Sequence, residues 1–303
     1  MSSIKERQNS SMNLNRLAAQ RQLYSEAKNL GCIQFVISGL AVIIFAIIGN
    51  LLDETYTVYI TLALIVCVLF DELFLTKRID CFRLKAATIQ EDFDCEVLQI
   101  PHNHLKNRHE STMECIQENS KKYLRKHNNY ELLTNWYPGV ESVDESYGKI
   151  LCQSTNCWWN QNLREKYSNV LISGTVAIFI ILLLIALIEG ITLSDFIMSV
   201  IYPILPGTIL VYKINSENKK AIQNLDHLKS KIDDIIVKLK RKELYDNVQL
   251  QNDIRFLQDM IFDNRSTSPL VPDKIYFKYR NNDEETAKAS NMELVELLKN
   301  KYE

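Results

Sequence analysis

Four long runs of apolar residues divide this chain, and polar segments separate them. The runs cover residues 31–52, 56–75, 170–188 and 193–212. At 1.5 Å per residue, a helix of about 20 residues crosses a hydrocarbon core of about 30 Å. The runs largely lack the polar residues at helical spacing that mark the exposed face of a soluble helix. The pattern therefore predicts four transmembrane helices, since lipid offers the backbone no hydrogen-bond partners outside a helix.

Very short links join the runs in pairs. Residues 53–55 connect the first two runs, and residues 190–192 connect the last two. Neither link is long enough to hold a domain. We therefore expect two transmembrane helical hairpins, at residues 31–75 and 170–213.

The basic residues all lie outside these hairpins. The chain has no Lys or Arg between Lys28 and Lys77, or between Lys166 and Lys213, although it contains 35 of them in total. Loops rich in Lys and Arg stay on the cytoplasmic side of a membrane. The distribution predicts that the N-terminus, the central segment and the C-terminus are cytoplasmic. The net charge of −2 gives no reason to expect DNA or RNA as a partner.

The polar segments are predicted to be mainly helical. Residues 1–30 are expected to form an N-terminal helix, 76–169 a central helical domain, and 214–303 a C-terminal helical region. Within them the pattern predicts, in order, a short strand at 93–101, helices at about 104–126 and 156–167, a long helix at 214–265 and a last helix at about 284–301.

The long C-terminal helix carries a coiled-coil-like apolar stripe. Its members follow one another at steps of three or four residues: Ile222, Leu225, Leu228, Ile232, Ile236 and Leu239. Such a stripe either packs on the central domain or joins a second copy of the chain, and the sequence leaves both open. The fold class expected is thus an all-α membrane protein with two hairpins, a helical cytoplasmic domain and this helix.

Signs of catalysis or metal binding are weak. The seven cysteines follow no disulfide framework and no zinc-ligand spacing, so we expect free thiols. His102-Asn103-His104 matches part of a nuclease motif but lacks its surroundings. Phosphate-binding loops and hydrolase motifs are missing, and the chain has only eight glycines. We expect no enzyme activity, no catalytic residues, no metal and no cofactor.

Polar and ionisable residues near the span ends, and two prolines within the fourth span, are candidate pore residues. In a channel they would line the mouths or the gate; alternatively they are solvated end residues. The candidates are Asn50, Asp71, Glu72, Glu189, Pro203 and Pro206. The two prolines also predict a kink in the fourth span.

Arginine and aromatic residues alternate in the polar segments. Rings stack on bases and guanidinium groups bind phosphates, so the set suits a nucleotide, although ordinary packing explains it as well. The set comprises Trp136, Tyr137, Trp158, Trp159, Arg164, Arg255, Arg265, Tyr276 and Arg280.

Short motifs along most of the chain resemble the SMODS-associating four-transmembrane effector family. They are Glu6 to Asn9, Leu17 to Tyr24 with Ala27-Lys28, Ile89 to Asp94, Trp136-Tyr137-Pro138, Cys152-Gln153 with Asn156, Trp159, Leu163-Arg164 and Tyr167, and Arg255 to Arg280 in parts. One departure is Ser154-Thr155, where the family leads us to expect a basic residue.

The resemblance implies a role in bacterial anti-phage defence. A cyclic oligonucleotide, or a partner protein, would trigger the effector to form a homo-oligomer and to permeabilise the inner membrane. The candidate ligand contacts are Arg21, Trp136, Gln153, Asn156, Trp159, Arg164 and Arg265. The alternative is a membrane scaffold that recruits a partner through its coiled coil without forming a pore.

Overall fold

The computed structural model describes residues 3–40, 44, 54–106, 111–137, 139–140, 145–240 and 246–299. Every regular element in these ranges is a helix, which confirms the all-α prediction for them. In chain order the elements are α1 (Ile4–Gln8), α2 (Ser11–Phe35), the π-helix η1 (Val36–Leu40), α4 (Glu54–Phe70), the π-helix η2 (Asp71–Leu75), α5 (Thr76–Leu98), α6 (Met113–His127), the 3-10 helix η3 (Glu131–Leu133), α7 (Glu145–Glu189), α8 (Leu193–Phe196), the π-helix η4 (Ile197–Ile201), α9 (Tyr202–Lys240), α10 (Asn247–Thr267) and α11 (Asp273–Lys299).

Side-chain caps fix where several helices begin. Ser3 and Glu6 form a reciprocal capping box at the start of α1. Ser10, Thr112 and Asp246 each accept a hydrogen bond from a backbone N–H in the first turn of α2, α6 and α10. These bonds satisfy donors that have no partner within the helix. The caps therefore define helix starts, such as those of α6 and α10, that the apolar pattern alone does not locate.

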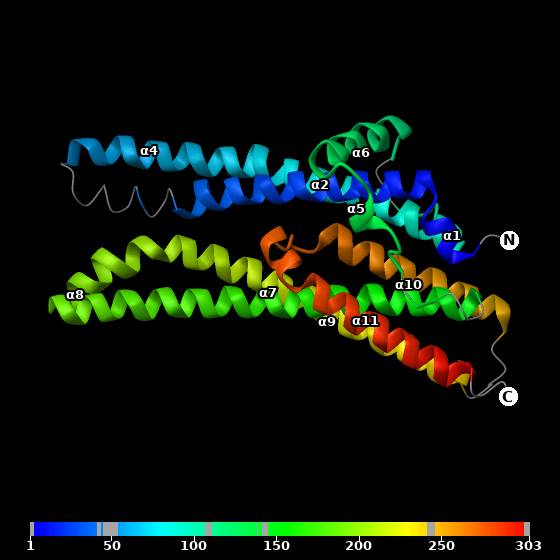
Figure 1. Cartoon of the computed structure of the whole chain (residues 1–303). Helices are drawn as coiled ribbons and strands as arrows, with labels where there is room; N and C mark the ends of the chain where they lie inside the picture. The colour runs from blue at the N-terminus through cyan, green and yellow to red at the C-terminus, as the bar shows by residue number, and fades with distance from the viewer. Residues whose placement is uncertain are drawn as a thin grey trace.

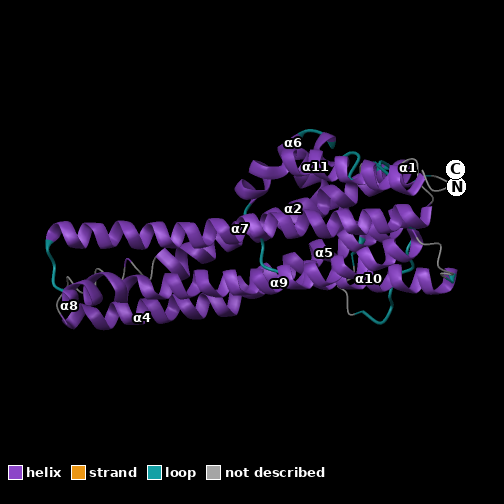
Figure 2. Cartoon of the chain, turned by 90° about the horizontal axis from the view of Figure 1, so that it is seen from below, coloured by secondary structure: helices purple, strands orange, loops and turns teal. Residues whose placement is uncertain are grey.

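The molecule is elongated (Figures 1 and 2). One end, the apolar end, exposes large apolar side chains, and the other, the polar end, is formed by the polar segments of the sequence. Both chain termini lie at the polar end, while the start of α4 and the junction between α7 and α8 lie at the opposite tip. Helix α7 runs through both ends as one helix of 45 residues, which at 1.5 Å per residue is about 68 Å long. A continuous helix of this kind links the two ends mechanically.

At the apolar end, large hydrophobic side chains point outward. Val58 is 69% exposed, Leu187 68% and Ile188 85%. Exposure of many such side chains on neighbouring helices calls for an apolar surrounding rather than water. Two continuous helical stretches of the described chain, Val58–Leu98 and Glu145–Glu189, are long and apolar enough to cross a membrane. The first contains the predicted second span from residue 58 onward, and the second contains the whole predicted third span.

The other two spans stay predictions. Much of the predicted first span, together with Asn50, falls at 41–43 and 45–53, outside the described residues. The predicted fourth span corresponds to α8, η4 and the beginning of α9. There the π-helical turn of η4 ends directly before Tyr202 and Pro203. Proline has no backbone N–H to donate, and helices with such a gap in their hydrogen bonds often contain a wider turn. Figure 1 shows this segment bowing away from α7 before α9 returns to it.

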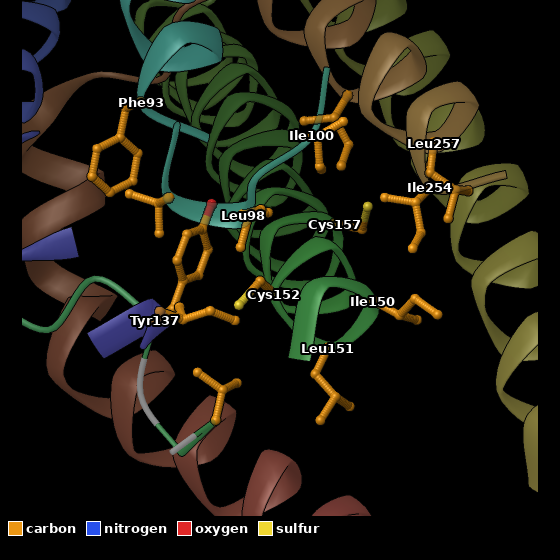
Figure 3. Close-up of a cluster of buried hydrophobic side chains, with 14 of the residues drawn as sticks. Phe93, Leu98, Ile100, Tyr137, Ile150, Leu151, Cys152, Cys157, Ile254 and Leu257 are labelled. Atoms are coloured by element: carbon orange, nitrogen blue, oxygen red, sulfur yellow. The ribbon is translucent and has the colours of Figure 1, made fainter. Parts of the chain in front are cut away.

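The polar end has one main hydrophobic core, to which the three polar segments of the sequence all contribute. Leu17 of α2, Phe93 of α5, Leu151 of α7 and Ile254 of α10 are buried in it together. Figure 3 shows Phe93 beside Tyr137, with side chains of α7 and α10 facing them; the two rings are stacked at 6.2 Å between centroids. The described parts of segments 1–30, 76–169 and 214–303 therefore fold against one another.

The strand predicted at 93–101 is wrong, because these residues mostly belong to α5. Phe93, Asp94 and Cys95 are consecutive and all buried, so the alternating pattern did not mark one face of a sheet. Helix α5 packs against both α2 and α10, which buries several of its faces. The helix ends where Gln99 adopts a left-handed conformation with φ of 49°.

The extents of four other predicted helices also need correction. The helix predicted at 214–265 is two helices, because α9 ends at Lys240 and α10 begins at Asn247 after its cap. The helix predicted from residue 104 begins at Met113, and the last helix begins at Asp273 rather than near 284. The helix predicted at 156–167 is an internal part of α7.

The apolar stripe of α9 is covered by the chain itself. Leu225, Leu228 and Ile232 are at most 2% exposed and belong to the same core as Ile254. Side chains that are already buried within one copy are not free to join a second copy. The structure thus favours the packing interpretation of the stripe over the coiled-coil interpretation.

Candidate functional site

A cavity of about 530 Å³ lies in the polar end. Its walls come from α2, α5, η3 and the segment that follows it, α7, the end of α10, the turn between α10 and α11, and α11. This volume is in the range of small-molecule sites. Three of these helices, α2, α5 and α7, connect directly to the apolar runs, so the cavity is built on the same helices as the apolar end.

Helical spacing explains how α2 and α7 present their side chains to the cavity. Arg21, Tyr24 and Lys28 follow one another at steps of three and four residues, which places them on one face of α2. Asn156, Trp159, Asn160 and Arg164 do the same on α7. Each helix therefore contributes a continuous stripe of polar and aromatic groups.

The structure brings six of the seven predicted ligand contacts together around this cavity. They are Arg21, Trp136, Asn156, Trp159, Arg164 and Arg265. Gln153 does not line it. Its side chain is fully buried, and its Nε2 donates to the Ile254 carbonyl at 2.9 Å and to Gln258 Oε1 at 3.1 Å. Through these two bonds Gln153 links α7 to α10, away from the cavity lining.

Three of the cations at the cavity are neutralised by carboxylates. The Nη1 of Arg265 donates to Asp94 at 2.5 Å, and Lys28 Nζ lies 2.6 Å from Asp273. The third, Arg280, donates to Glu284 at 2.7 Å. These pairs hold the cations in place and cancel most of their field.

Asp94 is the centre of a buried network below the cavity. It is fully buried and accepts hydrogen bonds from the Tyr137 hydroxyl at 2.5 Å and from Gln258 Nε2 at 3.0 Å, in addition to Arg265. The Tyr137 hydroxyl in turn accepts from Asn156 Nδ2 at 2.8 Å. Burial lowers the pKa of Arg265, but the charge of Asp94 outweighs it, so the net pKa is raised. Arg265 therefore serves this network as its counter-ion.

Arg164 is buried without a carboxylate partner in the described part of the chain. It is 6% exposed. Its Nε donates to Asn160 Oδ1 at 2.9 Å, and its Nη1 donates to Asn218 Oδ1 at 3.1 Å and to the Pro269 carbonyl at 3.0 Å. Burial lowers its pKa to about 10, so the guanidinium is charged at neutral pH.

Arg21 lies over aromatic rings instead of an acid. Its Cζ is 4.0 Å from the centroid of the Tyr276 ring and 5.0 Å from that of Phe277. Its Nη2 is buried, and no described residue accepts a hydrogen bond from it. Tyr276 also stands 6.3 Å from Trp159, ring centroid to ring centroid. Cationic and aromatic groups are thus interleaved on the wall formed by α2, α7 and α11.

Two residues of this wall, Tyr24 and Lys28, were not among the predicted contacts. Burial raises the pKa of Tyr24 to about 12 and lowers the pKa of Lys28, although Asp273 opposes the latter shift. Their spacing from Arg21 on α2 was the signal that could have identified them. Tyr276 and Arg280 belong to the alternating arginine and aromatic residues of the sequence analysis but were not predicted to contact a ligand.

Asn50 lies outside the described residues, and the other predicted pore residues do not meet at one place. Asp71 Oδ1 accepts hydrogen bonds from Gln34 Nε2 at 2.6 Å and from Thr76 Oγ1 at 3.3 Å, so it links α2 to the start of α5. Glu72 and Glu189 are exposed, at η2 and at the far end of α7. Pro203 and Pro206 lie in the first two turns of α9.

The fold and the cavity define a class of protein: a helical bundle with a cationic, aromatic cavity, continuous with apolar helices that fit a membrane. The chain belongs to the SMODS-associating 4TM effector domain family, whose model matches residues 2–294. It is accordingly a membrane protein. It is also similar to a protein of Bacillus cereus (strain VD146) described as a probable CBASS effector molecule, with 27% identity over 212 residues, or 69% of each chain. No solved structure matches the chain.

Proposed function

We propose that this protein is a membrane effector of bacterial anti-phage defence that opens in response to a cyclic oligonucleotide. The family to which the chain belongs and the name of its Bacillus relative support the defence role. On this proposal the protein catalyses no reaction. Ligand binding in the cavity favours a homo-oligomer whose hairpins permeabilise the inner membrane.

The observation that carries the proposal is the composition of the cavity wall. Arg21 and Arg164 offer positive charge, and Trp136, Trp159 and Tyr276 offer rings. A nucleotide combines an anionic phosphate with a base that stacks on aromatic side chains. A partner protein as trigger is less well supported, because a concave site of this volume suits a small ligand.

The connection between cavity and membrane supports a gating role for the ligand. Arg164 donates to Asn218 on α9, and Asn218 Nδ2 donates back to the Arg164 carbonyl at 2.8 Å. One turn closer to the apolar end, Ser168 Oγ donates to Asn215 Oδ1 at 2.6 Å. A ligand that draws Arg164 away from Asn218 would loosen α7 from α9 just outside the second hairpin. A ligand shifts such an equilibrium only by binding one arrangement more tightly than the other.

The membrane topology in this proposal follows the charge distribution. Four spans at 31–52, 56–75, 170–188 and 193–212 keep both termini in the cytoplasm. Asn50, Asp71, Glu72 and Glu189 would then stand near the pore mouths, and Pro203 and Pro206 would provide the gate hinge. The scaffold alternative loses support, because most of the α9 stripe that would recruit a partner is buried within the chain, at Leu225, Leu228, Ile232 and Ile236.

A leakage assay tests the proposal. Full-length protein is reconstituted in liposomes that hold a self-quenched dye, and a panel of cyclic di- and trinucleotides is added from outside. We expect dye release with at least one member of the panel and none with linear mononucleotides. Absence of ligand-dependent release across the panel, with correctly inserted protein, contradicts the proposal.

A further inference from the structure

Apart from the exposed Lys288, the cations at the cavity fall into two groups according to whether an acid neutralises them. Arg265, Lys28 and Arg280 each have a carboxylate within 2.7 Å. In the described part of the chain, Arg21 and Arg164 have none. This division separates cations that hold the fold from cations whose charge is still available.

The uncompensated charge of Arg164 is costly to the empty protein. A charge removed from water is stable only when other groups replace its hydration, and neutral amide and carbonyl oxygens do this less well than a carboxylate. Arg164 nevertheless sits in the wall 94% buried, since it is 6% exposed. A bound anion would offset this cost by supplying the counter-charge that Arg164 lacks.

Arg21 is also placed to bind an anion, but aromatic rings hold it instead of neutral oxygens. The rings of Tyr276 and Phe277 hold its guanidinium at 4.0 and 5.0 Å, which fixes its position without using its hydrogen-bond donors. Its buried Nη2 accordingly remains without an acceptor among the described residues. A buried donor without an acceptor costs free energy that a ligand oxygen would recover.

Arg21 and Arg164 act on the same region of the cavity. Both lower the pKa of Lys28 through their charge, in addition to the effect of burial, and the charge of Lys28 is balanced by Asp273. The remaining charged residues of the lining, Lys288, Glu131 and Glu285, are exposed, so water screens them. The inner part of the cavity therefore has an excess of two positive charges.

We infer that Arg21 and Arg164 together bind a ligand with at least two phosphate charges, one guanidinium for each, while Arg265 stays bound to Asp94. The identity of this ligand as a nucleotide rests on the proposed function. The Trp159–Tyr276 pair stands beside Arg21 and stacks on a base of the ligand. A cyclic dinucleotide or larger ring satisfies both arginines, whereas a 3′,5′-cyclic mononucleotide, with one charge, satisfies only one.

The test compares three matched substitutions in the detergent-solubilised full chain: Arg21→Gln, Arg164→Gln and Arg280→Gln. Arg280 lines the same cavity but is neutralised by Glu284, so it is the control. Binding of pyrophosphate, cyclic di-AMP and 3′,5′-cyclic AMP is measured by calorimetry and by the ligand-induced rise in Tm. Pyrophosphate provides two phosphates without a base and reports on the arginine pair alone.

We expect pyrophosphate to bind the wild type, and Arg21→Gln and Arg164→Gln each to weaken it roughly 10- to 100-fold, the loss of a charge-assisted contact. Arg280→Gln changes it by less than about threefold. The cyclic mononucleotide binds more weakly than the dinucleotide. Should Arg164→Gln fail to fold, Arg21→Gln decides, since Arg21 has no hydrogen bond to a described residue that glutamine would break.

The outcomes also separate this inference from the proposed function. If a cyclic oligonucleotide triggers leakage equally in wild type and both arginine variants, the arginine pair is wrong and the effector role stands. If pyrophosphate binds through Arg21 and Arg164 but no cyclic oligonucleotide causes leakage, the pair is right and the effector role fails. If neither pyrophosphate nor any cyclic oligonucleotide binds, the inference is overturned.

Discussion

Two walls of one cavity use the same residue type for opposite purposes. On the α10 wall, Arg265 is neutralised by Asp94, which also accepts from Tyr137 and Gln258. On the α2–α7 wall, Arg21 and Arg164 lie against rings and neutral oxygens. The comparison teaches that an arginine at a cavity points to a ligand only when the protein leaves its charge uncompensated. The experiments below change this balance, one wall at a time.

The largest effect is expected from Arg265→Met. This change leaves Asp94 fully buried without its counter-ion, and breaking a buried pair in this way costs about 3–5 kcal/mol. Chemical unfolding of the detergent-solubilised protein, followed by tryptophan fluorescence, measures the loss. Adding Asp94→Asn to the same chain removes the orphaned charge and should recover part of the stability. A variant as stable as the wild type would show that the two walls do not differ in this respect.

The second-largest effect is expected from Asn218→Asp, which gives Arg164 on the α7 side of the cavity a carboxylate partner. The new carboxylate would face the Nη1 of Arg164, which now donates to Asn218 Oδ1 at 3.1 Å. Because Arg164 would then have an internal partner, we expect pyrophosphate affinity to fall about tenfold, or about 1.4 kcal/mol. Asn215→Asp places the same charge one turn away, beside Ser168, and is the control. Equal effects of the two variants would point to a general charge effect instead.

A smaller change in stability is expected from Arg21→Met. The methionine keeps an apolar chain against Tyr276 and removes a donor that has no acceptor among the described residues. The free energy of unfolding of the empty protein should therefore shift by no more than about 0.5 kcal/mol. The same unfolding assay as for Arg265→Met gives a direct comparison of the two walls. A loss comparable to that of Arg265→Met would mean that Arg21 holds the fold.

The smallest effect is expected in the number of protons taken up when an anionic ligand binds near Lys28. Burial lowers the pKa of Lys28 below its usual 10.5. Between the lowered pKa and 10.5, the folded chain binds fewer protons than the unfolded chain, so stability rises with pH across this window. An anionic ligand raises the pKa again, and binding takes up a fraction of a proton. Calorimetry at a pH just below 10.5, in two buffers of different ionisation enthalpy, measures this uptake, and Lys28→Met should remove it.

Part of the cavity could be anticipated from the sequence, since arginine and aromatic residues alternate in the polar segments. Gln153 shows the limit of this reasoning, because it lies only three residues before Asn156 on α7, yet its side chain bonds to α10 while Asn156 lines the cavity. The predicted strand at 93–101 failed for a related reason. A short apolar run alternates in a helix buried on several sides as readily as in a strand.

What the sequence determined by itself is the division between lipid-compatible helices and polar helices. Length, hydropathy and the confinement of basic residues follow from local composition, because transfer to lipid depends on each segment separately. The tertiary structure alone decided which arginine is neutralised and which stays available. Asp94 lies far from Arg265 in the chain, as does Asp273 from Lys28, and only the packing of α5, α10 and α11 against α2 and α7 brings each charge to its partner.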